Sequence, residues 1–212
     1  MSDLPKKREF FHREEERRCI RAAQKGSREA FDVLVLRYTR NVYGFAMVLT
    51  GNPEDAWDVS QETFVKAFRK IRTYGFKAPF CSWLLSITRN TFKDRARKEL
   101  NIRAKHEAMG RDIPVTREDF DPEDVTNAKE KAAAVHRALE RVAEPFREVV
   151  HLFDIQGFSY AEVAVVCDVA MGTVKSRLRR GRDALRKELI KEGLVGKQKK
   201  SHETDNEGGG CR

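Results

Sequence analysis

The chain has 212 residues, which is enough for one ordinary domain or two small ones. Lys and Arg number 42 against 33 Asp and Glu, so the net charge is +9, a balance that favours nucleic acid or an acidic membrane surface as the partner. There is no apolar run near the roughly 18 residues of a transmembrane helix, and the N-terminus lacks the apolar core of a secretory signal. We therefore expect no membrane insertion and a cytoplasmic location.

The four cysteines lie far apart along the chain, at Cys19, Cys81, Cys167 and Cys211. None of them has the CxxC or His–Cys spacing of a metal site, and cytoplasmic thiols stay reduced. We therefore expect no metal site, no cofactor and no disulfide bond.

Apolar residues with helical spacing fill the first half of the chain. At the first interruption Gly51 breaks the pattern, and Asn52 followed by Pro53 is a favourable start for a new helix. The pattern predicts a bundle of helices. The apolar runs with steps of three and four cover residues 31–49, 59–71 and 80–92.

The middle of the chain changes character. Residues 101–128 contain Gly110, Pro114 and Pro122 with a run of acidic residues, which is typical of an extended linker. Helical periodicity then returns, and no strand-like alternation of useful length is present, so we predict an all-α fold of two small helical domains. The predicted parts are a flexible N-terminal extension (1–19), a first helical domain (20–100), an acidic linker (101–128), a second helical domain (129–190) and a disordered tail (191–212).

Residues 159–182 have the plan of a DNA-binding helix-turn-helix. Ser159 and Glu162 predict a capping box for a short helix, a tight turn follows at residues 167–169, and a long basic helix begins near Met171. Residues 170–187 carry seven Lys or Arg and one Asp. A solvated helix normally mixes charge signs, so this unopposed cationic face favours phosphates and a major groove.

Residues 53–62, PEDAWDVSQE, contain four carboxylates and no Lys or Arg. A helix N-terminus stabilises Glu54 and Asp55, but it does not account for Asp58 and Glu62, which lie one turn apart. An acidic patch repels DNA, so it favours a basic protein surface as its partner.

A third pattern places aromatic and amide groups on one helix face. Trp83, Ile87, Asn90, Asp94 and Arg97 are spaced four, three, four and three residues apart. A ring and an amide on one stripe suit the stacking and reading of an unpaired base. On the residues alone, the favoured interpretation is structural, with Trp83 in the core and the polar residues bonded locally.

Together, these motifs resemble those of the sigma-70 family of RNA polymerase sigma factors, most closely its extracytoplasmic function (ECF) group. The stretch GTVKSRL at residues 172–178, followed by Arg180 and Arg182, is similar to region four of that group. The acidic helix at residues 54–68 is similar to region two.

Three residues depart from the family pattern. Asp168 stands in the turn where the family usually has Gly, although Asp tolerates the left-handed conformation better than most residues. Ala170 replaces the usual Ser or Thr cap, a loss of about 1 kcal/mol of local stability. Trp57 stands where a charged or polar residue is usual.

The resemblance implies site residues on both domains. The polymerase-binding residues would be Asp55, Asp58, Gln61 and Glu62, docking on the clamp helices of the beta-prime subunit. The residues at the promoter −10 element would be Tyr74, Phe76, Trp83, Ile87, Asn90, Lys93 and Arg97, with Arg95 and Lys98 holding phosphates nearby. The residues at the −35 element would be Thr173, Lys175, Ser176, Arg179, Arg180 and Arg182, of which Ser176 and Arg179 would read base edges.

The resemblance also implies a function. The chain would be a sigma factor that binds core RNA polymerase, through its beta-prime clamp helices and beta flap, and directs it to promoter DNA. It would start transcription of stress- or signal-responsive genes in the bacterial cytoplasm, and an anti-sigma factor is an expected partner. No catalytic residue is expected, because the active site belongs to the polymerase.

The residues alone leave two other interpretations. A helix-turn-helix transcriptional regulator that does not load polymerase would account for residues 159–187 but not for the acidic helix or the aromatic stripe. An enzyme would need a site such as Cys81 beside Ser82. His151 with Asp154 is a second such pair. Both pairs lie in apolar helical patterns, without a phosphate loop or a nucleophile motif.

Overall fold

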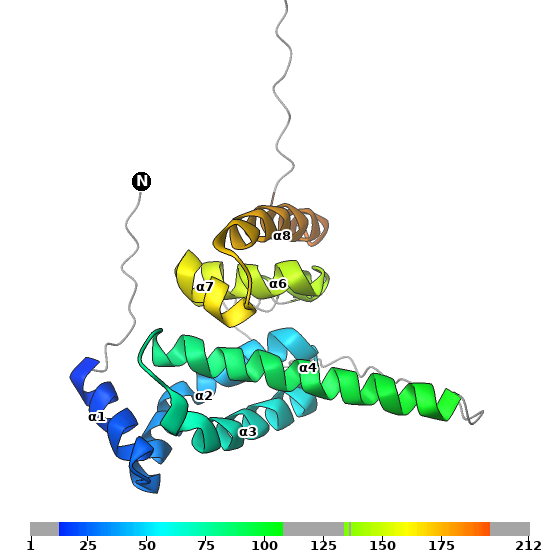
Figure 1. Cartoon of the computed structure of the whole chain (residues 1–212). Helices are drawn as coiled ribbons and strands as arrows, with labels where there is room; N and C mark the ends of the chain where they lie inside the picture. Colours follow the sequence, from blue (N-terminus) through cyan, green and yellow to red (C-terminus); the bar gives the residue numbers. More distant parts are fainter. Residues whose placement is uncertain (1–12, 108–133, 136, 196–212) are drawn as a thin grey trace, which may run out of the picture.

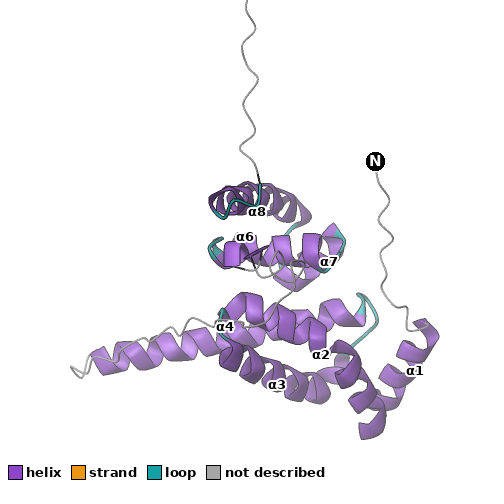
Figure 2. Ribbon diagram, turned by 180° about the vertical axis from the view of Figure 1, so that it is seen from behind, coloured by secondary structure: helices purple, strands orange, loops and turns teal. Residues whose placement is uncertain are grey.

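The computed structural model describes residues 13–107, 134–135 and 137–195. Over these ranges the regular elements are all helical and no strand is present, which confirms the predicted all-α fold (Figures 1 and 2). No helix of the described part is long and apolar enough to cross a membrane.

The first module contains four α-helices and one 3₁₀ turn. Their bounds are α1 Arg13–Gln24, α2 Arg28–Thr50, α3 Pro53–Lys70, η1 Ile71–Thr73 and α4 Phe80–Glu107. Gly51 ends α2 in the left-handed conformation, at φ 68°. The Asn52 side chain then accepts hydrogen bonds from the backbone N–H groups of Glu54 and Asp55, so the predicted helix start is confirmed.

Two helix boundaries differ from the sequence prediction. Helix α1 begins at Arg13, so the prediction of a flexible extension over residues 1–19 is wrong from residue 13 onward; residues 1–12 lie outside the described ranges. The helix is held because Ile20 and Ala23 are buried in the core. Helix α4 continues to Glu107, seven residues into the predicted linker, since residues 101–107 contain good helix formers and no Gly or Pro.

The second module is a compact set of short helices around a longer one. After a helical stretch at residues 137–140, its elements are α6 Glu144–Val150, a π-helical turn η2 His151–Ile155, α7 Tyr160–Cys167 and α8 Met171–Lys191. The Ser159–Glu162 capping box is present. Asp168 adopts the left-handed conformation, and Ala170 provides no side-chain cap. The predicted helix-turn-helix is confirmed.

The two modules pack against each other rather than standing apart. Helix α4 lies against α7, and α2 contacts α6 and η2, so buried residues of both modules form one continuous cluster. The His151 ring stacks on Phe45 of α2, with centroids 6.1 Å apart. Helix α8 lies on the side of α6 and α7 that faces away from α2 and α4 (Figures 1 and 2). The outer face of α8 is therefore turned away from the first module.

Candidate DNA-binding and protein-docking surfaces

Helix α8 has an apolar stripe on its buried side and a cationic stripe on its exposed side. Val174 and Leu178 are buried between α8 and its neighbours. Lys175, Ser176, Arg179 and Arg180 are exposed, and Thr173 is half-buried. Because α8 is the outermost layer of the described residues, no other described helix covers this cationic surface (Figures 1 and 2). Five of the six predicted −35 residues thus share an accessible part of α8.

Arg182, the sixth predicted −35 residue, is placed differently. Its Nη2 and Nε donate hydrogen bonds to the Asp154 carboxylate at 2.6 and 2.9 Å. The guanidinium also lies over the Phe153 ring, 5.4 Å from its centroid. The hydrogen bonds to Asp154 raise the pKa of Arg182. In this structure Arg182 links α8 to η2, and its predicted contact with a phosphate stays a prediction.

The predicted −10 residues divide into buried and exposed groups. Tyr74 and Ile87 are only 7% and 6% exposed, and the Tyr74 hydroxyl donates to the carbonyl of Ala78 at 2.7 Å. Burial raises the pKa of Tyr74 to about 12. Both side chains lie in the core in this structure, and their predicted contact with the −10 element stays a prediction. Trp83 and Phe76 are half-buried, while Asn90, Lys93 and Arg97 are exposed.

Residues 74–83 form a cluster of aromatic rings. The centroid of the Tyr74 ring lies 4.8 Å from that of Phe76, 5.3 Å from that of Phe80 and 5.2 Å from that of Trp83. Phe76 has a left-handed backbone, φ 58°, which is strained for a residue with a bulky side chain. The loop before α4 thus has a defined shape, and Phe76 is its half-exposed ring.

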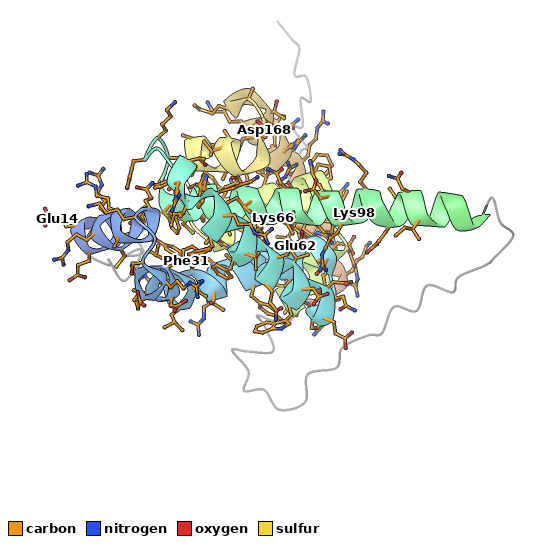
Figure 3. The ribbon with its side chains drawn as sticks, turned by 60° about the horizontal axis from the view of Figure 1, so that its bottom comes forward. Glu14, Phe31, Glu62, Lys66, Lys98 and Asp168 are labelled. Carbon is orange, nitrogen blue, oxygen red and sulfur yellow. The ribbon has the colours of Figure 1, made fainter. Side chains whose placement is uncertain are left out.

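The acidic face of α3 is partly neutralised within the protein. Arg95 of α4 bonds Glu62 at 3.0 Å and Asp58 at 3.3 Å, and Lys66 bonds Glu62 at 3.0 Å. Figure 3 shows Glu62 and Lys66 next to each other on α3. Burial raises the pKa of Glu62, but the hydrogen bonds from Lys66 and Arg95 outweigh it, so the net shift is downward. Arg95 is bonded to these carboxylates here, and its predicted phosphate contact stays a prediction.

Beside this face lies an open hollow between α2 and α3 that the sequence analysis did not predict. Its volume is about 1060 Å³. Leu36 and Trp57 are 81% and 53% exposed, and the Trp57 ring meets Tyr43 edge to face at 6.5 Å. The signal in the sequence was Trp57 itself, an apolar ring in an acidic helix. The hollow is lined by Leu36, Thr39, Arg40, Tyr43, Pro53, Glu54, Asp55, Trp57 and Asp58.

The residues nominated for an enzyme have structural roles. Cys81 and His151 are buried, and Asp154 is bonded to Arg182. Among the described residues no group of His, Cys, Asp and Glu is arranged to hold a metal ion.

Comparison with known families matches both modules. Residues 34–101 match the family described as Sigma-70 region 2, and residues 132–185 match the family described as Sigma-70, region 4. The chain is 39% identical over 163 residues to the ECF RNA polymerase sigma factor SigE of Mycolicibacterium smegmatis, covering 76% of this chain and 62% of that one. It is 30% identical to the RNA polymerase sigma-H factor of Pseudomonas aeruginosa, covering 83% of this chain and 94% of that one.

Two solved structures are also similar. The first is the sigma factor RpoE of Bartonella quintana in complex with the anti-sigma factor NepR, with a TM-score of 0.61, 28% identity and coverage of 76% of this chain and 96% of that one. The second is CnrH in complex with the cytosolic domain of CnrY, with a TM-score of 0.62, 25% identity and coverage of 84% and 99%.

Proposed function

This chain belongs to the sigma-70 family of RNA polymerase sigma factors, in its ECF group, and we propose that it binds core RNA polymerase and directs it to promoter DNA. Sigma factors are not enzymes; they supply recognition to the polymerase. The observation that carries the proposal is the division of charge between two surfaces, one acidic and apolar on α2 and α3, the other cationic on α8. We propose that the first meets protein and the second meets DNA.

The acidic surface supports docking to a basic and apolar partner. Asp55 is exposed at the rim of the hollow, beside the rings of Trp57 and Tyr43. Aromatic anchors next to charge are typical of the energetic centre of an interface. We propose that the beta-prime clamp helices occupy this hollow, with Gln61 at its edge. On docking, Asp58 and Glu62 would give up their ion pairs with Arg95 and form new ones with the polymerase.

The cationic surface supports recognition of the −35 element. Arg179 and Ser176 lie on the exposed part of α8, where a major groove can reach them. Lys175 and Arg180 are exposed beside them and are placed to neutralise phosphates. We propose that Arg179 and Ser176 read base edges and that Arg180 and Lys175 hold the backbone. The beta flap of the polymerase is the proposed partner for the rest of this module.

In the first module the exposed part of α4 supports contact with the −10 element. Asn90, Lys93 and Arg97 are exposed on one stripe, and Phe76 is the half-exposed ring of the preceding loop. We propose that Phe76 and Asn90 receive an unpaired base while the two cations hold the backbone. The buried ring of Tyr74 packs against Phe76 and holds the loop in place.

We propose that each helical module corresponds to one sigma region. We propose region two over residues 20–100 with α1 added to it, and region four over residues 129–190. An anti-sigma factor is the proposed regulator, since the similar structure of RpoE is a complex with an anti-sigma factor. Because promoter DNA and polymerase are the proposed partners, we infer that the protein acts in the bacterial cytoplasm.

A reconstitution experiment tests the proposal. Purified chain is expected to co-elute with bacterial core polymerase and to give transcripts that share a pair of upstream promoter elements. Asp55→Lys is expected to weaken the co-elution, because it places a cation at the rim of the hollow. Asp32→Lys makes the same charge change at an exposed position of α2 outside the hollow and serves as the control.

Failure to associate with core polymerase, in the absence of any inhibitor, contradicts the proposal. Binding of promoter DNA that blocks transcription by another holoenzyme would instead support the transcriptional regulator.

A further inference from the structure

The loop between η1 and α4 is fastened to α1, a helix to which the proposed function assigns no task. The Nε2 atom of Gln24 donates hydrogen bonds to the carbonyl oxygens of Ile71 at 3.0 Å and Tyr74 at 2.8 Å. These carbonyls flank the turn that leads into the loop. One amide group of α1 therefore fixes the position from which the loop departs.

Two arginines of the same helix reach the tip of that loop. The guanidinium carbons of Arg17 and Arg21 lie 5.8 and 6.0 Å from the centroid of the Phe76 ring, within the range of cation–π attraction. Arg17, Arg21 and Gln24 recur at steps of four and three residues, so they share one face of α1. The strained backbone of Phe76 keeps its ring beneath this face.

The charges of both arginines remain accessible at this site. Arg17 and Arg21 are exposed. Two acidic residues of α1 make other contacts, since Glu15 pairs with Arg18 at 3.9 Å and Glu16 accepts a hydrogen bond from Tyr38. A cationic edge around an aromatic ring has the composition of a single-strand binding surface.

We propose that α1 is a further DNA-contacting element, in which Arg17 and Arg21 bind backbone phosphates of the separated promoter strand beside the base received at Phe76. Gln24 is a positioning residue that sets the geometry of the loop and thereby its choice of base. This inference rests on the proposed function of the first module. The alternative is that the arginines merely cover the Phe76 ring, and the experiment separates the two.

The experiment uses holoenzyme assembled from core polymerase and the full chain. The probe is a fluorescent single-stranded oligonucleotide carrying the −10 element found by mapping transcript starts, with a scrambled oligonucleotide for comparison. Affinity is measured over a range of salt concentrations. Each phosphate contact on a single strand contributes about 0.7 to the slope of log affinity against log salt.

The double variant Arg17→Ala/Arg21→Ala is expected to lower this slope by about 1.4 while preserving the preference for the −10 sequence. Arg17→Lys/Arg21→Lys is expected to restore the slope, since charge is kept. Arg28→Ala is the control. It removes one positive charge, against two in the double variant, at an exposed position of α2 beside a different hollow, and should leave the slope unchanged.

Gln24→Met keeps the length of the side chain and removes both hydrogen bonds. It is expected to reduce the preference for −10 over scrambled sequence about tenfold without changing the salt slope or the affinity for core polymerase. A purely structural role of Gln24 would leave the preference intact.

The outcomes separate the proposed function of this surface from the role of α1. Wild-type holoenzyme that shows no preference for the −10 oligonucleotide overturns the proposed function of the surface. Wild-type holoenzyme with that preference, combined with an unchanged slope in the double alanine variant, overturns the role of α1.

Discussion

Arg89 of α4 and Glu148 of α6 form a buried ion pair, with Nε of Arg89 donating to Oε2 of Glu148 at 2.8 Å. The Arg89 side chain is 9% exposed and that of Glu148 is fully buried. Burial raises the pKa of Glu148, and the charge of Arg89 opposes this shift. The pair joins α4 of the first module to α6 of the second.

Removing one partner of this pair leaves the other charge buried and unpaired in the core. We expect Glu148→Ala to lower the free energy of unfolding by about 3–5 kcal/mol, measured by urea denaturation of the full chain. Replacing both partners by apolar residues, as in Arg89→Met/Glu148→Leu, should recover most of this loss, because no uncompensated charge remains.

The matched control is the ion pair between Arg141 and Glu192, which is also short, at 2.6 Å, but involves a half-exposed arginine. Glu192→Ala should lower stability by less than about 1 kcal/mol. Equal losses for Glu148→Ala and Glu192→Ala would contradict the assignment of Arg89–Glu148 as the energetic link.

The packed arrangement of the modules is too small to touch both promoter elements at once. Elements centred at −10 and −35 are separated by about 25 base pairs, or about 85 Å at about 3.4 Å each, whereas α4, the longest helix of the described residues, spans only about 42 Å with its 28 residues. We therefore expect the modules to separate when holoenzyme binds a promoter, with loss of the Arg89–Glu148 pair.

Energy transfer between dyes measures this separation. Val65 on α3 and Val165 on α7 are exposed attachment points after substitution by Cys, in a chain with Cys19 and Cys211 replaced by Ser. Transfer should be high in the free protein and fall on promoter binding. High transfer in a transcribing complex would show that the closed arrangement persists.

The sequence predicted those features that depend on neighbours along the chain. Gly51, Asn52 and the Asp168 turn were predictable because helix caps use residues within one turn of each other. The pairs Arg89–Glu148 and Arg182–Asp154 were not, because their members lie 59 and 28 residues apart and meet only after packing.

In the candidate sites too, contacts between residues distant in sequence could not be predicted. Periodicity located the cationic face of α8, but it could not tell which arginines would find a carboxylate within the protein. It also could not place α1 over the −10 loop, because that contact joins residues about 50 positions apart, as with Gln24 and Tyr74.

Gly181 marks the closest approach of α6 and α8. A Cβ atom there would lie 2.5 Å from Cγ2 of Val150 and 3.0 Å from the Phe146 carbonyl oxygen. Gly181→Ala should therefore destabilise the protein by about 1–3 kcal/mol, since the backbone must move. A Cβ atom at Gly44 of α2 would meet no neighbouring element within 4 Å, so Gly44→Ala should stabilise the helix by about 0.5–1 kcal/mol. Thermal unfolding that gave both changes the same sign would contradict this difference between the two glycines.

Substitution of Trp57 tests whether the hollow between α2 and α3 is the polymerase-docking site. If the polymerase covers its exposed ring, Trp57→Ala should weaken association with core polymerase by more than about tenfold, as for other aromatic anchors. Val65→Ala removes an exposed apolar side chain from the same helix outside the hollow and should have little effect. Fluorescence anisotropy of labelled chain titrated with core polymerase gives both affinities. Equal affinities for the two variants would exclude Trp57 from the interface.

Arg179 and Arg182 lie one turn apart on α8 and should respond differently to the same change. Arg179 is exposed, so Arg179→Ala should lose about 1–3 kcal/mol of discrimination between wild-type and mutated −35 elements. Arg182 is bonded to Asp154, so Arg182→Ala should reduce the stability of the second module and weaken binding to all promoters by a similar factor. Transcription by each holoenzyme from wild-type and −35-mutated promoters, together with urea unfolding, separates the two effects. Retained discrimination in Arg179→Ala would assign base reading to another residue of α8. Loss of discrimination in Arg182→Ala, at unchanged stability, would return that arginine to the DNA interface that the sequence predicts for it.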